Sequence, residues 1–60
     1  MIPITPQWVV SVRENGHDLE GVAIALSTDP DAMRDDLFCV IVGDTHGWYG
    51  WLQIDWVQQL

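Results

Sequence analysis

The stretch Trp8-Val9-Val10-Ser11-Val12-Arg13-Glu14-Asn15-Gly16-His17-Asp18-Leu19 decides the fold. Its first half alternates large apolar residues with Ser11 and Arg13, and a period of two is typical of a β-strand. The Asn15-Gly16 pair that follows favours a type I′ turn, because both central residues of that turn need a positive φ. The sequence therefore predicts an antiparallel hairpin with its turn at residues 15–16.

A two-residue turn also fixes which residues of the hairpin lie opposite one another. The predicted pairs are Glu14 with His17, Arg13 with Asp18, and Val12 with Leu19. Arg13 and Asp18 would then form a favourable cross-strand ion pair. An uninterrupted register, however, places the apolar residues at positions 22, 24 and 26 on the face opposite Val12. We therefore expect a one-residue bulge at Glu20-Gly21, because glycine inside a strand often marks a bulge.

The remaining residues predict one short helix and two more strands. Ser27-Thr28-Asp29-Pro30 joins an N-cap oxygen to a proline at the first helical position, so a short helix is expected over Pro30–Asp36. Leu37–Gly43 is apolar on both faces, as in a central strand. A turn at 44–47 and a last strand over Trp48–Val57 follow. The expected fold is α+β but β-dominated, in the order ββαββ: a four-stranded antiparallel sheet with one short helix, forming a single domain over residues 1–60 with an extended lead-in at 1–6.

The end of the chain suggests an alternative fold. Gly50-Trp51-Leu52-Gln53-Ile54-Asp55-Trp56-Val57 resembles the closing signature of Src-homology-3-type barrels, Gly-x-hydrophobic-Pro-x-Asn-Tyr-Val. Gln53, Asp55 and Trp56 replace the Pro, Asn and Tyr of that family. The resemblance implies a small SH3-like five-stranded barrel, in which Trp56-Val57 belongs to a separate strand and the helix is only a turn.

The front half carries a second resemblance. A strand, a tight hairpin, a second strand and an acidic helix start are similar to the small podovirus-encoded inhibitor of bacterial RNA polymerase. The matching positions are Val12, Glu14, His17, Glu20 and Ile24.

The charge balance limits the classes of partner. Nine acidic residues face two arginines, there is no lysine, and the formal net charge is −7. Direct nucleic-acid binding and binding to anionic membranes both depend on Lys and Arg, so neither is expected. The acids either keep a Trp-rich small domain soluble or attract a partner protein with a basic surface. A single cysteine, Cys39, and the absence of a leader or a long apolar run lead us to expect a cytoplasmic protein.

Catalytic and metal-binding patterns are weak. Asp44-Thr45-His46 contains the residue types of a nucleophilic triad, but adjacent turn residues do not adopt triad geometry by themselves. The aspartates at 29–36 lack the spacing and glycine of a calcium loop, and His17, His46 and Cys39 do not have a zinc spacing. We therefore expect no enzyme activity, no metal and no cofactor.

The expected contact surface combines aromatic and acidic residues. If one face of the last strand packs inward, the other face exposes aromatic side chains, which are enriched at binding hot spots. The candidate partner-binding residues are Tyr49, Trp51, Asp29, Asp31, Asp35 and Asp36. We expect a small, acidic, non-enzymatic protein-binding domain, such as a phage or mobile-element inhibitor that blocks the basic, nucleic-acid-binding surface of a host protein by mimicking DNA charge. The alternative is a structural or homodimeric module that uses the Trp-rich last strand as its interface.

Overall fold

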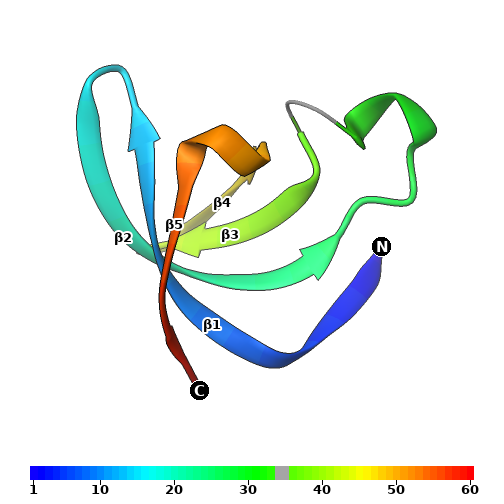
Figure 1. Cartoon of the computed structure of the whole chain (residues 1–60), viewed down its shortest axis with the longest axis horizontal. Helices are drawn as coiled ribbons and strands as arrows, with labels where there is room; N and C mark the ends of the chain where they lie inside the picture. The colour runs from blue at the N-terminus through cyan, green and yellow to red at the C-terminus, as the bar shows by residue number, and fades with distance from the viewer. Residues whose placement is uncertain (34–35) are drawn as a thin grey trace.

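A computed structural model describes residues 1–33 and 36–60 of the chain, and these residues form a single antiparallel sheet of five strands. The strand order is β4-β3-β2-β1-β5 (Figure 1). The elements along the chain are β1 (Ile2–Glu14), β2 (His17–Leu26), the 3-10 turn η1 (Pro30–Met33), β3 (Phe38–Val42), β4 (Thr45–Tyr49), the 3-10 turn η2 (Trp51–Gln53) and β5 (Ile54–Gln59). None of the described helical segments has the length and apolar character needed to cross a membrane.

The sheet is strongly curled, and its connectivity explains why. β4 and β5 are the two outer strands, yet only residues 50–53 join them. The edges of a flat five-stranded sheet lie about 19 Å apart. Even fully extended, the link from Tyr49 to Ile54 reaches at most about 18 Å, and η2 shortens it further. The long strands β1 and β2 therefore bend and bring the end of β4 near the start of β5, while β4 and β5 remain the outer strands of an open sheet and do not pair with each other (Figure 1).

The hairpin predicted from Asn15-Gly16 is confirmed. Both residues have positive φ, 52° at Asn15 and 78° at Gly16. All three predicted pairs flanking the turn are present in the β1–β2 register. Arg13 Nε lies 3.2 Å from Asp18 Oδ1, which is the predicted cross-strand ion pair.

The predicted bulge at Glu20-Gly21 is wrong. β1 and β2 pair without interruption from Glu14↔His17 to Trp8↔Ala23, so Gly21 and Ala23 face the core with Val10. A side chain at Gly21 would not fit, because its Cβ would lie 2.6 Å from the Ile41 carbonyl oxygen. The β1–β2 register shifts farther from the turn, between Pro3 and Trp8, and the β2–β3 register shifts between Ala23 and Ala25.

The order ββαββ is also not confirmed, because the described residues contain only 3-10 turns in place of a helix. At the expected helix start, only Pro30–Met33 forms a turn, and the rest of the expected segment includes residues 34 and 35, which lie outside the described residues. The expected last strand divides at Gly50 into β4 and β5. The fold is therefore a small β-sheet fold with five strands instead of four.

The core lies inside the curl. Its buried side chains come from all five strands: Val10, Val12, Ala23, Phe38, Val40, Tyr49 and Ile54. Partly buried residues, among them Trp8, Leu26 and Trp56, pack against this cluster. Because the described residues form a single sheet with no second layer over it, the partly buried rings of Trp8 and Trp56 cover the end of the core and form part of the surface.

Candidate functional site: an open aromatic cleft and an acidic hollow

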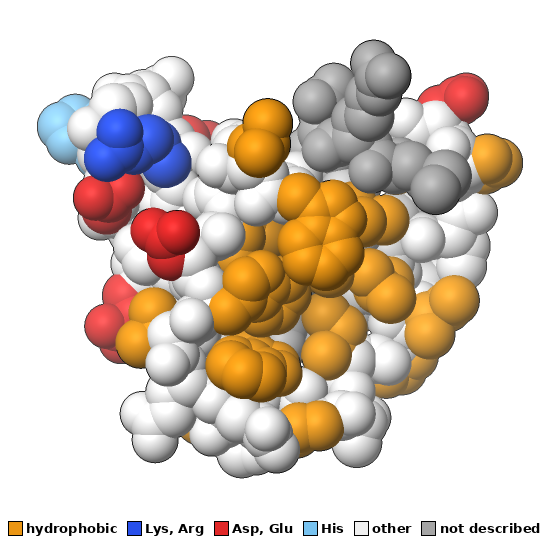
Figure 2. Space-filling view, in the orientation of Figure 1, with side chains coloured by type: hydrophobic (Ala, Val, Ile, Leu, Met, Phe, Trp, Pro, Cys, Tyr) orange, Lys and Arg blue, Asp and Glu red, His pale blue; other side chains and the backbone are white. Residues whose placement is uncertain are grey.

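An apolar cleft opens on the face of the molecule shown in Figure 2, where hydrophobic side chains form one patch. Its volume is about 360 Å³, and the described residues that line it are all apolar: Ile4, Trp8, Leu26, Phe38, Trp51 and Trp56. These residues come from β1, β2, β3, η2 and β5, so the curl of the sheet assembles the cleft. In Figure 2 the acidic side chains lie at the margins, outside the apolar patch.

Four aromatic rings of the cleft pack mainly edge to face. Phe38 lies 4.7 Å from Trp51 and 5.0 Å from Trp56 between ring centroids, with interplanar angles of 86° and 79°. Trp8 contacts Trp56 in the same way at 6.0 Å and 87°. Such pairs contribute about 0.5–1.5 kcal/mol each beyond burial of area, which fixes the ring orientations. Trp51 still exposes 57% of its surface, so the ring that covers Phe38 also presents a free surface.

Gln53 holds η2, and with it Trp51, against the hairpin. The Gly50 N–H donates to Gln53 Oε1 at 3.2 Å, and Gln53 Nε2 donates to the Arg13 carbonyl at 3.3 Å. The Gln53 N–H donates to the Gly50 carbonyl at 3.1 Å and closes the turn. One side chain therefore joins the turn to β1, and Trp51 is presented from an anchored segment.

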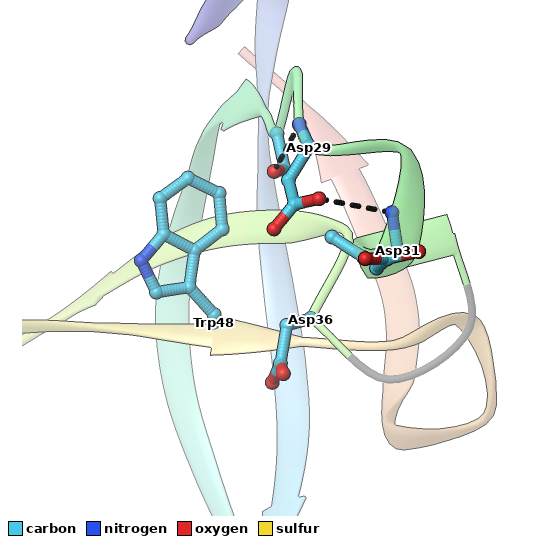
Figure 3. A pocket seen from close by; sticks show the side chains of 6 residues that line it. Asp29, Asp31, Asp36 and Trp48 are labelled. Carbon is cyan, nitrogen blue, oxygen red and sulfur yellow. Dashed lines mark hydrogen bonds between the residues drawn. The ribbon is translucent and has the colours of Figure 1, made fainter.

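An acidic hollow of about 450 Å³ lies beside η1 (Figure 3). Its lining residues are Ser27, Asp29, Asp31, Ala32, Asp36 and Trp48. The local fold is held by side-chain caps, because the Asp29 N–H donates to Ser27 Oγ at 3.1 Å and the Asp31 N–H donates to Asp29 Oδ1 at 2.9 Å. All three carboxylates are exposed, and the indole of Trp48 forms the aromatic wall of the hollow that they line.

The cleft and the hollow lie on opposite faces of the sheet but share one boundary. Leu26 pairs with Phe38, and both line the cleft. Trp48 is the neighbour of Tyr49 on β4 and faces the other way, which places it in the hollow. Ser27 follows Leu26 directly, and its N–H donates to the Leu37 carbonyl at 2.8 Å. The junction between β2 and β3 therefore separates the aromatic surface from the acidic one.

The strand periodicity predicted that Tyr49 lies on an outer face of the sheet, and this prediction is wrong. Tyr49 is buried, and its hydroxyl donates to Glu14 Oε2 at 2.9 Å, which ties β4 to the end of β1. Burial raises the pKa of the Tyr49 phenol, and the hydrogen bond to Glu14 raises the pKa further. The strand break at Gly50 caused this error, because it separates the faces of Tyr49 and Trp51. Tyr49 is thus placed to close the fold, and it contributes little surface to a partner.

The other candidate residues lie on two separate surfaces. Trp51 is exposed at the cleft, whereas Asp29, Asp31 and Asp36 surround the hollow, and Asp35 lies outside the described residues. Sequence reasoning missed Trp8, Phe38 and Trp56 as cleft residues and Trp48 as the aromatic wall of the hollow. The eight-residue closing signature was the available signal, because it implied a separate strand at Trp56-Val57. The structure places the break earlier, so that β5 begins at Ile54.

Within residues 1–33 and 36–60, no three side chains of His, Cys, Asp or Glu are grouped as a metal site would require. Thr45 Oγ1 donates to the Val42 carbonyl at 3.2 Å and so stabilises its own hairpin. Cys39 is buried, and burial raises the pKa of its thiol, which disfavours the reactive thiolate.

Comparison with protein-family models, with curated proteins and with solved structures gave no significant match for this chain.

Proposed function

We propose that this chain is a non-enzymatic protein-binding domain whose aromatic cleft receives apolar side chains from a partner with a basic surface. The open cleft carries the proposal, since four rings converge there and Trp51 remains 57% exposed. Trp is among the residues most enriched at binding hot spots. The described lining of the cleft offers no general acid, general base or nucleophile, so its chemistry suits binding.

The charge of the chain supports the choice of a basic partner. A formal charge of −7 creates a field that accelerates encounter with a cationic surface and weakens with salt. A phage or mobile-element inhibitor that covers the nucleic-acid-binding surface of a host protein is one specific form of this proposal. In that form, the acids would replace DNA phosphates while the cleft anchors the complex.

The test is a binding measurement with matched variants. Proteins captured from lysate at low and high salt would be identified by mass spectrometry. The affinity of each identified protein for the purified wild-type chain would then be measured. Trp51→Ala should weaken binding by about 2 kcal/mol or more and act on dissociation. Leu52→Ala is the matched control, because Leu52 is fully exposed on the same turn but does not line the cleft. Equal affinity of wild type and Trp51→Ala would contradict the proposal.

The acids have a separate test. Asp29→Asn combined with Asp31→Asn should slow association and flatten its salt dependence, with little effect on dissociation. Asparagine keeps the side-chain oxygen of Asp29 that accepts the Asp31 N–H, so the turn should remain intact. An unchanged association rate at low salt would show that these acids serve only solubility.

A homodimeric module is the second candidate, and exposed apolar residues in η2, in β5 and directly after β5 favour it. Leu52 is fully exposed, and Val57 and Leu60 expose 63% and 60% of their surfaces. A dimer formed there should show a thermal midpoint that rises with protein concentration. Leu52→Ser combined with Val57→Ser should abolish that dependence, and a monomer in sedimentation at high concentration would exclude the dimer.

We also infer that the curled sheet is a small SH3-like barrel, the alternative fold expected from the sequence. Support comes from the five strands and from the signature residues 50–57, which run through η2 into β5. Backbone chemical shifts showing that residues 51–53 do not form a turn between β4 and β5 would contradict this classification.

A further inference from the structure

The two outer strands of the sheet differ in how their free edges are protected. An edge strand presents unpaired N–H and C=O groups, and proteins commonly protect these groups with bulges, proline, lysine or a covering segment. On β5 the register shifts between Val9 and Val10, so Val57 has no partner between Trp56 and Gln58. This irregularity interrupts the spacing of hydrogen-bonding groups along the outer side of β5.

In the part of the chain that the structure describes, the edge of β4 carries none of these protections. Its five residues pair with β3 without a shift, from Phe38↔Tyr49 to Val42↔Thr45. β4 contains neither proline nor lysine. Among the described elements, β3 is the only one with extensive contacts to β4. The outer side of β4 is therefore a regular template for another strand.

The turn that precedes β4 defines which groups point outward. Val42 and Thr45 flank the two-residue turn Gly43-Asp44, in which Gly43 has a φ of 60°. Inward and outward backbone groups alternate along an antiparallel strand, and the residues that flank such a turn point inward. The backbone N–H and C=O groups of His46 and Trp48 therefore point away from β3.

The charges around this edge determine the partner. Asp44 lies at one end of β4, and the acidic hollow lies at the other end, with Trp48 as its wall. β3, β4 and the described lining of the hollow contain no lysine or arginine. A second copy would bring the same acids to the interface, and like charges oppose such pairing. A basic strand would instead place cationic side chains near Asp44 and the hollow.

We propose that the free edge of β4 accepts an extended basic segment of a partner protein, which adds to the sheet as an antiparallel or parallel sixth strand. Main-chain hydrogen bonds to His46 and Trp48 supply the affinity, and the acids at both ends of β4 select lysine and arginine. This surface is distinct from the aromatic cleft, so it extends the proposed function and does not depend on it.

The test uses the isotope-labelled chain and a short peptide of alternating lysine and threonine at low salt. Amide shift changes should be concentrated on β4, and hydrogen exchange of the His46 and Trp48 amides should slow. His46→Pro should weaken binding by about tenfold, the effect of losing one or two net hydrogen bonds. Proline is tolerated on an edge strand where its missing N–H would face solvent, so the variant should remain folded. If it does not, a synthetic chain with N-methylated Trp48 removes the same kind of donor.

The controls separate this surface from the others. A peptide of alternating glutamate and threonine should not bind, and Trp51→Ala should bind the basic peptide like wild type. The proposal would be overturned if the basic peptide did not bind, or if its amide shift changes were confined to the cleft. Wild-type affinity of His46→Pro or of the chain N-methylated at Trp48 would also overturn it. If, without any peptide, protection of the His46 and Trp48 amides from exchange increased with protein concentration, the edge would bind a second copy of the chain. That result would also overturn the proposal.

Discussion

Replacing Tyr49 with phenylalanine tests how the curled sheet is closed. The Tyr49 hydroxyl donates to Glu14 Oε2 at 2.9 Å across 35 residues of chain, and the ring itself is buried. A hydrogen bond to a charged group contributes about 1.5–3 kcal/mol. Because Glu14 is otherwise exposed, its carboxylate is rehydrated when the bond is lost, so the cost should be near 1.5 kcal/mol. For a domain of this size the thermal midpoint should fall by about 6–12 °C.

The pH dependence of the same variant provides an independent readout. The pKa of Tyr49 is raised in the folded state by burial and by Glu14, so the neutral phenol stabilises the fold. That contribution is fully present below the unfolded pKa of about 10 and is lost as the pH rises through the folded pKa. Chemical denaturation between about pH 9 and pH 11 should show a steeper loss of stability for wild type than for Tyr49→Phe. Cys39 also has a raised pKa, but it is present in both proteins and does not affect the difference.

Two controls define the interpretation of this experiment. The chain has a single tyrosine, so the phenolate absorbance reports Tyr49 directly. Glu14→Gln keeps an acceptor but removes the charge, and the double-mutant cycle with Tyr49→Phe should give a coupling of about 1 kcal/mol. A neutral effect at pH 7, together with identical alkaline profiles, would refute the idea that this bond closes the sheet.

Two glycine substitutions test the hairpin and the core by different mechanisms. Gly16→Val should cost more than about 1 kcal/mol in chemical denaturation through backbone strain alone. The φ of Gly16 is 78°, and apart from Gly16 and its two chain neighbours no atom of the described residues lies within 4 Å of the place that a Cβ would occupy. Gly16→Asn should cost much less, and equal losses would exclude backbone strain as the cause. Gly21→Ala should cost about 1–3 kcal/mol by overpacking. The added Cβ would lie 2.7 Å from Val40 Cγ1 and 2.6 Å from the Ile41 carbonyl oxygen. An unchanged denaturation midpoint would mean that β2 and β3 separate more easily than their packing indicates.

The sequence predicted the parts of the fold that depend on local chemistry. The hairpin register followed from two residues, Asn15 and Gly16, because few other residue pairs accept two positive φ values in succession. The β3 strand followed from a continuous apolar run. In both places the same residues define the conformation and the pairing, so no distant contact was needed to interpret them.

The errors arose where distant segments decide the conformation. Gly21 was interpreted as a bulge marker, but it is required by the close approach of Val40 and Ile41 on β3. The period-two pattern after Trp48 was extended through Gly50, although the short link between the two edges requires a turn there. The candidate site was affected in the same way, since the turn exposes Trp51 and leaves Tyr49 inside. Only the closing signature at residues 50–57 carried information about this break.

The exposure of η2 helps to distinguish a binding surface from a simple lid on the core. Trp51 contacts Phe38, so part of its surface does cover the core, and that part alone would explain a large ring at this position. Leu52 has no such explanation, because it is fully exposed on the same anchored turn. Exposed apolar area does not stabilise the fold, and in a chain with a charge of −7 it does not improve solubility either. The Gln53 hydrogen bonds anchor both side chains on one turn, but the two residues suit different candidate contacts. The exposed part of Trp51 lines the aromatic cleft, whereas Leu52 lies outside the cleft and suits the homodimer contact.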